Sequence, residues 1–169
     1  MRAGEIYHEE IGFIWGWIAN ILFFGMTVLF LVLYFVQITS GPIGENPAPD
    51  WLLLLYPLFF LIIGIFMVNF IKLTISADAS GITAAYGRFR YFVAWDNIES
   101  VEPDPGPAIF HYGGWGIRFA WRSGGSVIVY NTANAALLLM KLKRGKRAYF
   151  GFSTRHPEEV KALINSWKK

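Results

Sequence analysis

A long stretch of uncharged, mostly apolar residues lies near the start of the chain. No charged residue occurs between Ile11 and Val36. As an α-helix at about 1.5 Å per residue, this stretch would be roughly 39 Å long, more than the roughly 30 Å hydrocarbon core of a bilayer. A second uncharged stretch, Trp51 to Ile71, would be roughly 31 Å long. The two stretches therefore predict two transmembrane helices, at about 11–36 and 51–71.

A signal peptide or a pair of buried helices would fit these stretches less well. A cleaved signal peptide has an apolar region of only about 7 to 15 residues after a basic start, whereas here Arg2 is followed by Glu5, Glu9 and Glu10. Two buried helices of a soluble protein would need apolar cover on every side, which a chain of 169 residues does not provide. We therefore favour membrane spans.

The segment between the two stretches predicts a helical hairpin and its orientation. Gln37 to Asp50 is rich in Gly and Pro, which end helices and form turns. This segment contains no Lys or Arg, whereas every Lys and Arg except Arg2 lies between Lys72 and Lys169. Because positive charge near membrane spans stays in the cytoplasm, we expect a multi-pass protein of the cell membrane. Both termini and a domain at 72–169 would be cytoplasmic, after an N-terminal segment and hairpin at 1–71.

Few polar residues lie inside the predicted spans. Asn20, Thr27 and Asn69 are not ionisable, so the basic chemistry of an ion or proton pathway is missing. We expect Asn20 to form a hydrogen bond across the helix interface. Gly12 and Gly16, four residues apart, would allow the helices to approach closely.

After Lys72 the pattern changes to short β-prone segments separated by turn residues, and it ends in an amphipathic helix from Pro157 with His156 as its cap. We expect the first three segments to form a meander and the last two a hairpin. The fold class is thus α+β, a small barrel or bent sandwich covered by the helix. The expected strands are Leu73–Ala77, Ile82–Tyr86, Phe89–Ala94, Ile98–Glu102, Ile117–Trp121, Ser126–Tyr130, Leu137–Leu142 and Ala148–Phe152.

Several motifs resemble those of one family. They are Tyr86-Gly87, Trp95-Asp96-Asn97-Ile98, Tyr112-Gly113-Gly114-Trp115-Gly116-Ile117-Arg118 and Pro157-Glu158-Glu159. Together they look like the prokaryotic pleckstrin-homology-like (PH-like) membrane proteins, some of which also carry a transmembrane hairpin. The resemblance implies a seven-stranded barrel capped by the C-terminal helix. In eukaryotic relatives a basic loop between the first two strands holds inositol phosphates. The corresponding turn here, Asp78 to Gly81, has no Lys or Arg, so phosphoinositide recognition there is not expected.

The glycine-rich motif is the first candidate site. Tyr112, Trp115 and Arg118 could line a groove that binds a protein partner, because aromatic residues and Arg are favoured at interfaces. A structural bend would account for the same residues, because glycines allow unusual backbone angles. Arg118 could instead pair with a buried carboxylate such as Asp96.

The densest cluster of positive charge is the second candidate site. Near a cytoplasmic leaflet, each Lys or Arg of such a cluster gains about 1 kcal/mol of binding free energy from anionic lipid. The alternative is a solvated hairpin tip that prevents aggregation of sheet edges. The candidate lipid-binding residues are Lys141, Lys143, Arg144, Lys146 and Arg147.

Catalytic, cofactor-binding and metal-binding chemistry is not expected. The chain has no cysteine, which excludes thiolate metal sites and cysteine nucleophiles. His8, His111 and His156 lack metal-ligand spacing, and Asp96 and Glu99 are explained by a polar strand edge as simply as by an acid pair. No phosphate loop, nucleophile elbow, dinucleotide fingerprint or nucleic-acid motif is present.

The sequence therefore predicts a noncatalytic, membrane-anchored interaction or scaffold module. Its partners would be membrane lipids together with a membrane protein or a second copy of the chain, so that it serves as a subunit of a membrane assembly. The alternative is a sensor of anionic lipid that uses the basic hairpin.

Overall fold

The computed structural model describes residues 5–106 and 108–168 of the chain. These residues form two compact units. The helical unit comprises residues 14–71, and the β unit comprises residues 5–13 together with 72–168. The sequence pattern grouped the N-terminal segment with the hairpin, whereas residues 5–13 belong to the β unit. The hairpin is therefore an insertion between two parts of one sheet-forming unit.

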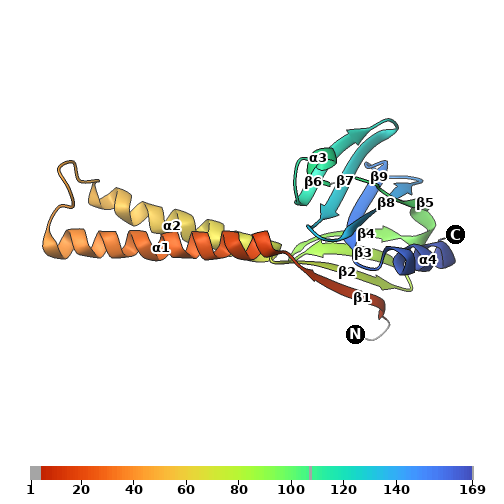
Figure 1. Cartoon of the computed structure of the whole chain (residues 1–169), viewed down its shortest axis with the longest axis horizontal. Coiled ribbons are helices and arrows are strands. Elements are labelled where there is room, and N and C mark those ends of the chain that lie inside the picture. Colours follow the sequence, from red (N-terminus) through yellow and green to blue (C-terminus); the bar gives the residue numbers. More distant parts are fainter. Residues whose placement is uncertain (1–4, 107, 169) are drawn as a thin grey trace. The chain divides into compact units, whose positions relative to one another are not determined.

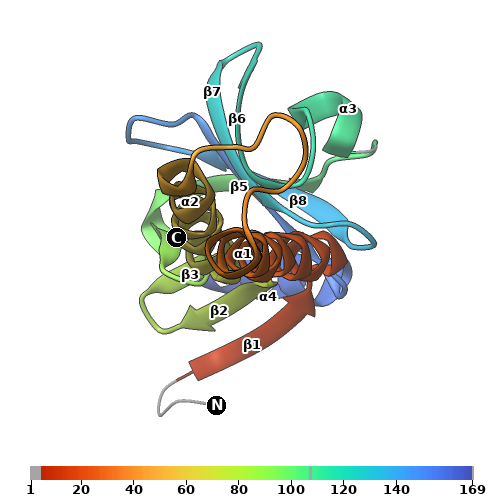
Figure 2. The same cartoon turned by 90° about the vertical axis from the view of Figure 1, so that its left-hand side faces the viewer.

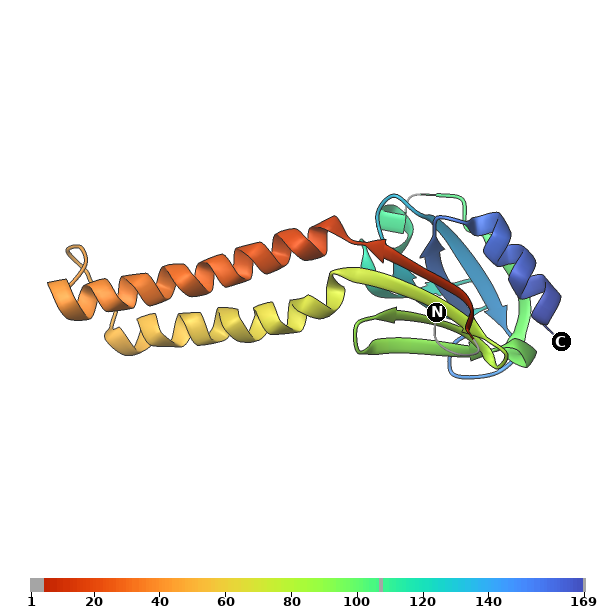
Figure 3. The ribbon, with the colours of Figure 1, turned by 90° about the horizontal axis from the view of Figure 1, so that it is seen from below.

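The helical unit consists of two antiparallel helices that lie side by side (Figure 3). Both are long and apolar enough to cross a membrane, and only 11% of the most apolar part of the first helix and 17% of that of the second are buried. Such exposed apolar surface suits contact with lipid better than the core of a soluble protein. The helices are α1 (Ile14–Ser40) and α2 (Asp50–Met67), and α2 continues into the short helix η1 (Val68–Phe70).

Aromatic packing and one polar side chain hold the hairpin together. The ring of Phe30 lies 4.8 Å from that of Tyr56 and 5.6 Å from that of Phe60, measured between centroids. At the loop end, Gln37 Nε2 donates hydrogen bonds to the carbonyl of Ala48 at 2.7 Å and to Asp50 Oδ1 at 2.6 Å. The first helix therefore ends at Ser40 and not at Val36. Gln37 lies within the helix, and its side chain binds the loop.

The predicted role of Asn20 is wrong. Its Nδ2 donates to the carbonyl of Gly16, one turn earlier in α1, at 2.7 Å. Gly12 lies in a strand, so it does not form a helix face with Gly16. Of these two glycines, Gly16 is the one at a close approach, since a Cβ there would collide with the carbonyl of Phe70, whereas a Cβ at Gly12 would meet nothing.

The β unit contains two sheets (Figures 1 and 2). Every predicted β segment after Lys72 is a strand, which confirms the meander β2–β3–β4 and the hairpin β8–β9. Neither sheet closes into a barrel within the described part of the chain. One sheet has the order β1-β2-β3-β4, with β1 (Glu5–Gly12), β2 (Lys72–Asp78), β3 (Gly81–Tyr86) and β4 (Phe89–Ala94). The other has the order β5-β8-β9-β7-β6, with β5 (Ile98–Pro103), β6 (Gly116–Arg122), β7 (Gly125–Asn131), β8 (Ala136–Leu142) and β9 (Tyr149–Thr154).

Strand β1 is the main element that the sequence pattern did not predict. It pairs with β2 from Glu5 to Gly12, which lies opposite Lys72. Tyr7, Glu9 and Ile11 are buried and alternate with exposed residues. This alternation is the period of a strand with one buried face. The expected start of the first helix at Ile11 is therefore wrong, because Ile11 is a core residue of the sheet.

Aromatic side chains connect the two sheets across the core. Tyr86 on β3 lies 6.3 Å from Tyr130 on β7, and Tyr91 on β4 lies 4.7 Å from Phe150 on β9. The predicted C-terminal helix is confirmed as α4 (Pro157–Trp167). The apolar stripe of α4 packs on the sheets of the β unit through buried Val160 and Ile164. The side chain of the expected cap, His156, makes no capping hydrogen bond.

Candidate functional site

The glycine-rich motif forms a bend between a short helix, α3 (Ala108–Tyr112), and β6, which lie beside each other (Figure 2). Gly113, Gly114 and Gly116 have φ angles of 71°, 125° and 99°. Residues with a Cβ avoid these angles. The motif thus has a structural role that follows directly from its backbone.

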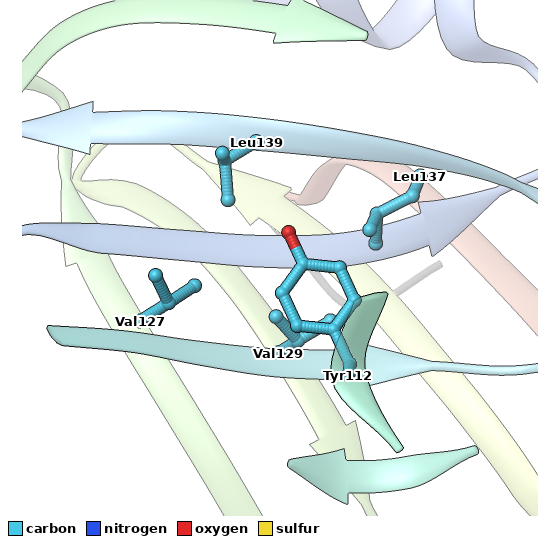
Figure 4. Packing of buried hydrophobic residues seen from close by; sticks show 5 residues of the cluster. All are labelled: Tyr112, Val127, Val129, Leu137 and Leu139. Atoms are coloured by element: carbon cyan, nitrogen blue, oxygen red, sulfur yellow. The ribbon is translucent and has the colours of Figure 1, made fainter. Parts of the chain in front are cut away.

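Tyr112 is part of the core. Its side chain is only 6% exposed, and its hydroxyl donates a hydrogen bond to Asp104 Oδ2 at 2.6 Å. Asp104 Oδ1 in turn accepts a hydrogen bond from Arg122 Nη2 at 2.7 Å. Burial, together with the bond to Asp104, raises the pKa of the Tyr112 hydroxyl. The ring packs among four aliphatic residues of the second sheet (Figure 4): Val127, Val129, Leu137 and Leu139.

The remaining two candidate partner-binding residues are partly buried. Trp115 packs against Phe13, with 6.4 Å between ring centroids. The buried Nε of Arg118 finds no hydrogen-bond acceptor among the described residues. Arg118 does not pair with Asp96, whose ion pair is with Arg144. Partner binding by Tyr112, Trp115 and Arg118 stays a prediction, and it would have to use Trp115 and Arg118 because the Tyr112 side chain is already packed.

The basic turn between β8 and β9 is held by acidic and polar groups of the preceding segment. Lys141 Nζ lies 2.7 Å from Glu99 Oε1, and Arg144 Nη2 lies 2.5 Å from Asp96 Oδ2. Asn97 accepts hydrogen bonds from the backbone N–H groups of Lys143 and Arg144, both at 2.9 Å. Asp96 and Glu99 are therefore partners of the basic turn.

The basic turn keeps a positive charge after these two ion pairs are counted. Lys141, Lys143, Arg144, Lys146 and Arg147 contribute five charges, and Asp96 and Glu99 subtract two, which leaves +3. The hydrogen bond from Lys141 to Glu99 raises the pKa of this lysine further above neutral pH.

Exposed aromatic rings lie next to this turn. Phe119 is 62% exposed and Trp121 is 83% exposed. Both belong to β6, which is one of the two edge strands of the second sheet, and they point to the same face because they are two residues apart. The guanidinium carbon of Arg147 lies 4.9 Å from the centroid of the Phe119 ring, which is a cation–π contact.

The sequence pattern did not single out Phe119 and Trp121. They alternate with Arg118, Ala120 and Arg122 in the way expected of the apolar face of an ordinary strand. Their exposure results from the sheet order, which places β6 at the edge. We call the following group of residues the aromatic–cationic surface: Phe119, Trp121, Lys143, Arg144, Lys146 and Arg147.

A shallow hollow of about 420 Å³ lies within this surface. Trp121 and the basic turn form its walls, and Ser126, Leu142 and Ala148 contribute to its lining. The hollow offers cationic hydrogen-bond donors next to an aromatic ring. Such a combination suits the binding of an anionic group attached to an apolar body.

The described residues contain no cluster of three His, Asp or Glu side chains that could hold a metal ion. Comparison of the chain with protein-family models, with curated proteins and with solved structures finds no match.

Proposed function

We propose that the protein is a noncatalytic, membrane-anchored module whose β unit binds the surface of an anionic membrane. The two helices act as the anchor, and the aromatic–cationic surface contacts the lipid headgroups of the cytoplasmic leaflet. The observation that carries this proposal is the exposure of Phe119 and Trp121 beside a turn with a net charge of +3. Tryptophan favours the headgroup region, and Lys and Arg are attracted to anionic lipid.

The expected binding strength fits a tethered domain. At about 1 kcal/mol for each positive charge near the leaflet, a net charge of +3 contributes about 3 kcal/mol. This corresponds to roughly a hundredfold preference for an anionic over a neutral surface. The anchor keeps the β unit close to the bilayer, so weak intrinsic affinity is sufficient.

A role as a scaffold for a membrane-protein partner or a second copy has less support in the side chains. Tyr112, which that hypothesis placed at the interface, uses both its ring and its hydroxyl inside the β unit.

The cytoplasmic orientation is supported by the loop of the hairpin, Gln37 to Asp50, which lacks Lys and Arg.

A fluorescent probe on the surface tests this function in the full-length protein. The chain has no cysteine, so the Ser123→Cys variant carries a single thiol, at an exposed position two residues from Trp121. The variant is labelled with an environment-sensitive dye and placed in lipid nanodiscs. We expect a blue shift of emission in nanodiscs with phosphatidylserine relative to phosphatidylcholine alone. The shift should disappear at about 0.5 M salt, which screens the charges. Identical spectra in both lipids would overturn the proposal.

Matched charge variants show whether this surface, and not the overall charge of the β unit, causes the spectral shift. Lys146→Gln with Arg147→Gln neutralises two cations of the turn, and Arg88→Gln with Arg90→Gln neutralises two exposed cations of the β3–β4 hairpin. We expect the first double variant to lose most of the spectral shift and the second to keep it. An equal loss in both would contradict the assignment to the aromatic–cationic surface.

A further inference from the structure

Building on the proposed membrane docking, we propose that the hollow beside Trp121 binds the phosphomonoester headgroup of an anionic lipid. The basic turn would then recognise a particular headgroup, in addition to providing general attraction to negative charge. Three properties of the hollow carry this inference: its fixed walls, its charge and its aromatic rim.

The walls of the hollow are held in place by hydrogen bonds. The backbone N–H of Ala148 donates to the carbonyl of Ser126 at 2.9 Å, and that of Leu142 donates to the carbonyl of Ala148 at 2.9 Å. The hydroxyl of Ser126 donates to the carbonyl of Lys146 at 3.1 Å. Asn97 fixes the opposite side of the turn. These bonds hold the turn in one arrangement before a ligand binds, which lowers the cost of ordering it on binding.

The charge of the hollow matches a phosphomonoester better than a phosphodiester. Lys143, Arg144, Lys146 and Arg147 line it, and Asp96 pairs with Arg144, so these five side chains sum to +3. A phosphomonoester carries a charge of about −1.5 to −2 at neutral pH and three acceptor oxygens. A diester carries about −1 and offers fewer such oxygens. Charge-assisted hydrogen bonds to Lys and Arg therefore favour the monoester.

The size and rim of the hollow favour a lipid as the source of this group. Its volume of about 420 Å³ falls in the range of ligand pockets and exceeds what a phosphate group alone requires. The exposed rings of Trp121 and Phe119 provide apolar surface next to the cations, where the glycerol and upper acyl region of a docked lipid would lie. A soluble phosphomonoester would leave these rings in water.

The experiment uses the labelled full-length Ser123→Cys variant in nanodiscs. Phosphatidic acid supplies a phosphomonoester, and phosphatidylserine supplies a diester, with the two kinds of nanodisc adjusted to equal zeta potential. We expect phosphatidic acid to give the half-maximal shift at a mole fraction at least fivefold lower. An equal response to the two lipids would overturn this inference and leave membrane docking in place. No response to either lipid would overturn both.

Two further arms identify the site and the source of the phosphate. Lys146→Gln removes a cation that lines the hollow, whereas Lys141→Gln removes a nearby cation at the end of β8 that does not. Only Lys146→Gln should reduce the preference for phosphatidic acid to below twofold; an equal effect of both variants would contradict the assignment to the hollow. A full shift produced by soluble glycerol 3-phosphate in neutral nanodiscs would overturn the lipid as the source.

Discussion

Glu9 connects the start of the β unit to its end. Its side chain is buried, and its Oε2 accepts hydrogen bonds from the hydroxyls of Tyr7 at 2.9 Å and Thr154 at 2.6 Å. Its Oε1 accepts one from the backbone N–H of Arg155 at 2.9 Å. Glu9 thus fastens β1 to the end of β9, directly before α4. A buried carboxyl group with three donors is costly to remove, because each donor is then left without an acceptor.

We therefore predict that Glu9→Ala lowers the free energy of unfolding by about 3 kcal/mol. Glu10→Ala is the control, since Glu10 is exposed and pairs with Lys72 at the surface, where such pairs contribute about 1 kcal/mol or less. Thermal unfolding followed by circular dichroism of the β-sheet signal in detergent measures both. Similar losses in the two variants would show that the Glu9 hydrogen bonds do not hold β1.

The buried tyrosines predict a loss of stability in alkali. Burial raises the pKa of Tyr7, Tyr86 and Tyr112 in the folded protein, while in the unfolded chain a tyrosine loses its proton at about pH 10. The stabilisation is therefore complete below about pH 10 and is lost as the pH rises from there toward the folded-state value. Tyr112→Phe removes one of these groups, so the melting temperature should fall less steeply above pH 10 than in the unmodified protein. Parallel curves would contradict the role of Tyr112.

The local sequence pattern predicted where the strands lie better than it predicted which strands pair with each other. Alternating residues and turns located β2 to β9, because both signals lie within a few neighbouring residues. The parallel pairing of β7 with β9 and the edge position of β6 depend on residues distant in sequence. Strand β1 was not predicted because Ile11, Gly12 and Phe13 continue the apolar run of α1, and because Glu9 is a buried carboxyl group on an otherwise apolar face.

Because β1 belongs to the sheet, the segment after the hairpin is not a complete unit. We predict that a fragment of residues 72–169 is poorly folded, since β2 loses β1, one of its two neighbouring strands, and Thr154 and Arg155 lose Glu9. Residues 5–12 joined to residue 72 by a short Gly-Ser turn should fold, because Gly12 and Lys72 are paired directly. Dispersion of amide NMR signals measures both. Equal dispersion in the two proteins would contradict the structural role of β1.

The sequence singles out the cationic residues of the candidate site but not the aromatic ones. The basic turn is a cluster of neighbouring residues, so composition alone reveals it. Phe119 and Trp121 lie at least twenty positions earlier in the chain and reach the turn only through the pairing of β6 with β7 and of β7 with β9.

The proposed orientation gives a separate prediction for cysteine labelling in cells. A thiol at Glu45→Cys, in the exposed loop of the hairpin, should react with a membrane-impermeant maleimide from outside. A thiol at Ser123→Cys should react only after the membrane is opened. The reverse pattern would show that the β unit lies on the opposite side of the membrane, away from the anionic leaflet.

Quenching of a surface dye by spin labels at the lipid headgroups measures contact between the aromatic–cationic surface and the bilayer. The dye at Ser123→Cys is compared with the same dye at Ala162→Cys, an exposed position on α4, in anionic nanodiscs that contain lipids with spin labels at the headgroup. We predict strong quenching at position 123, weak quenching at position 162, and loss of the difference in the Lys146→Gln, Arg147→Gln background. Equal quenching at the two positions in the unmodified background would contradict docking through this surface.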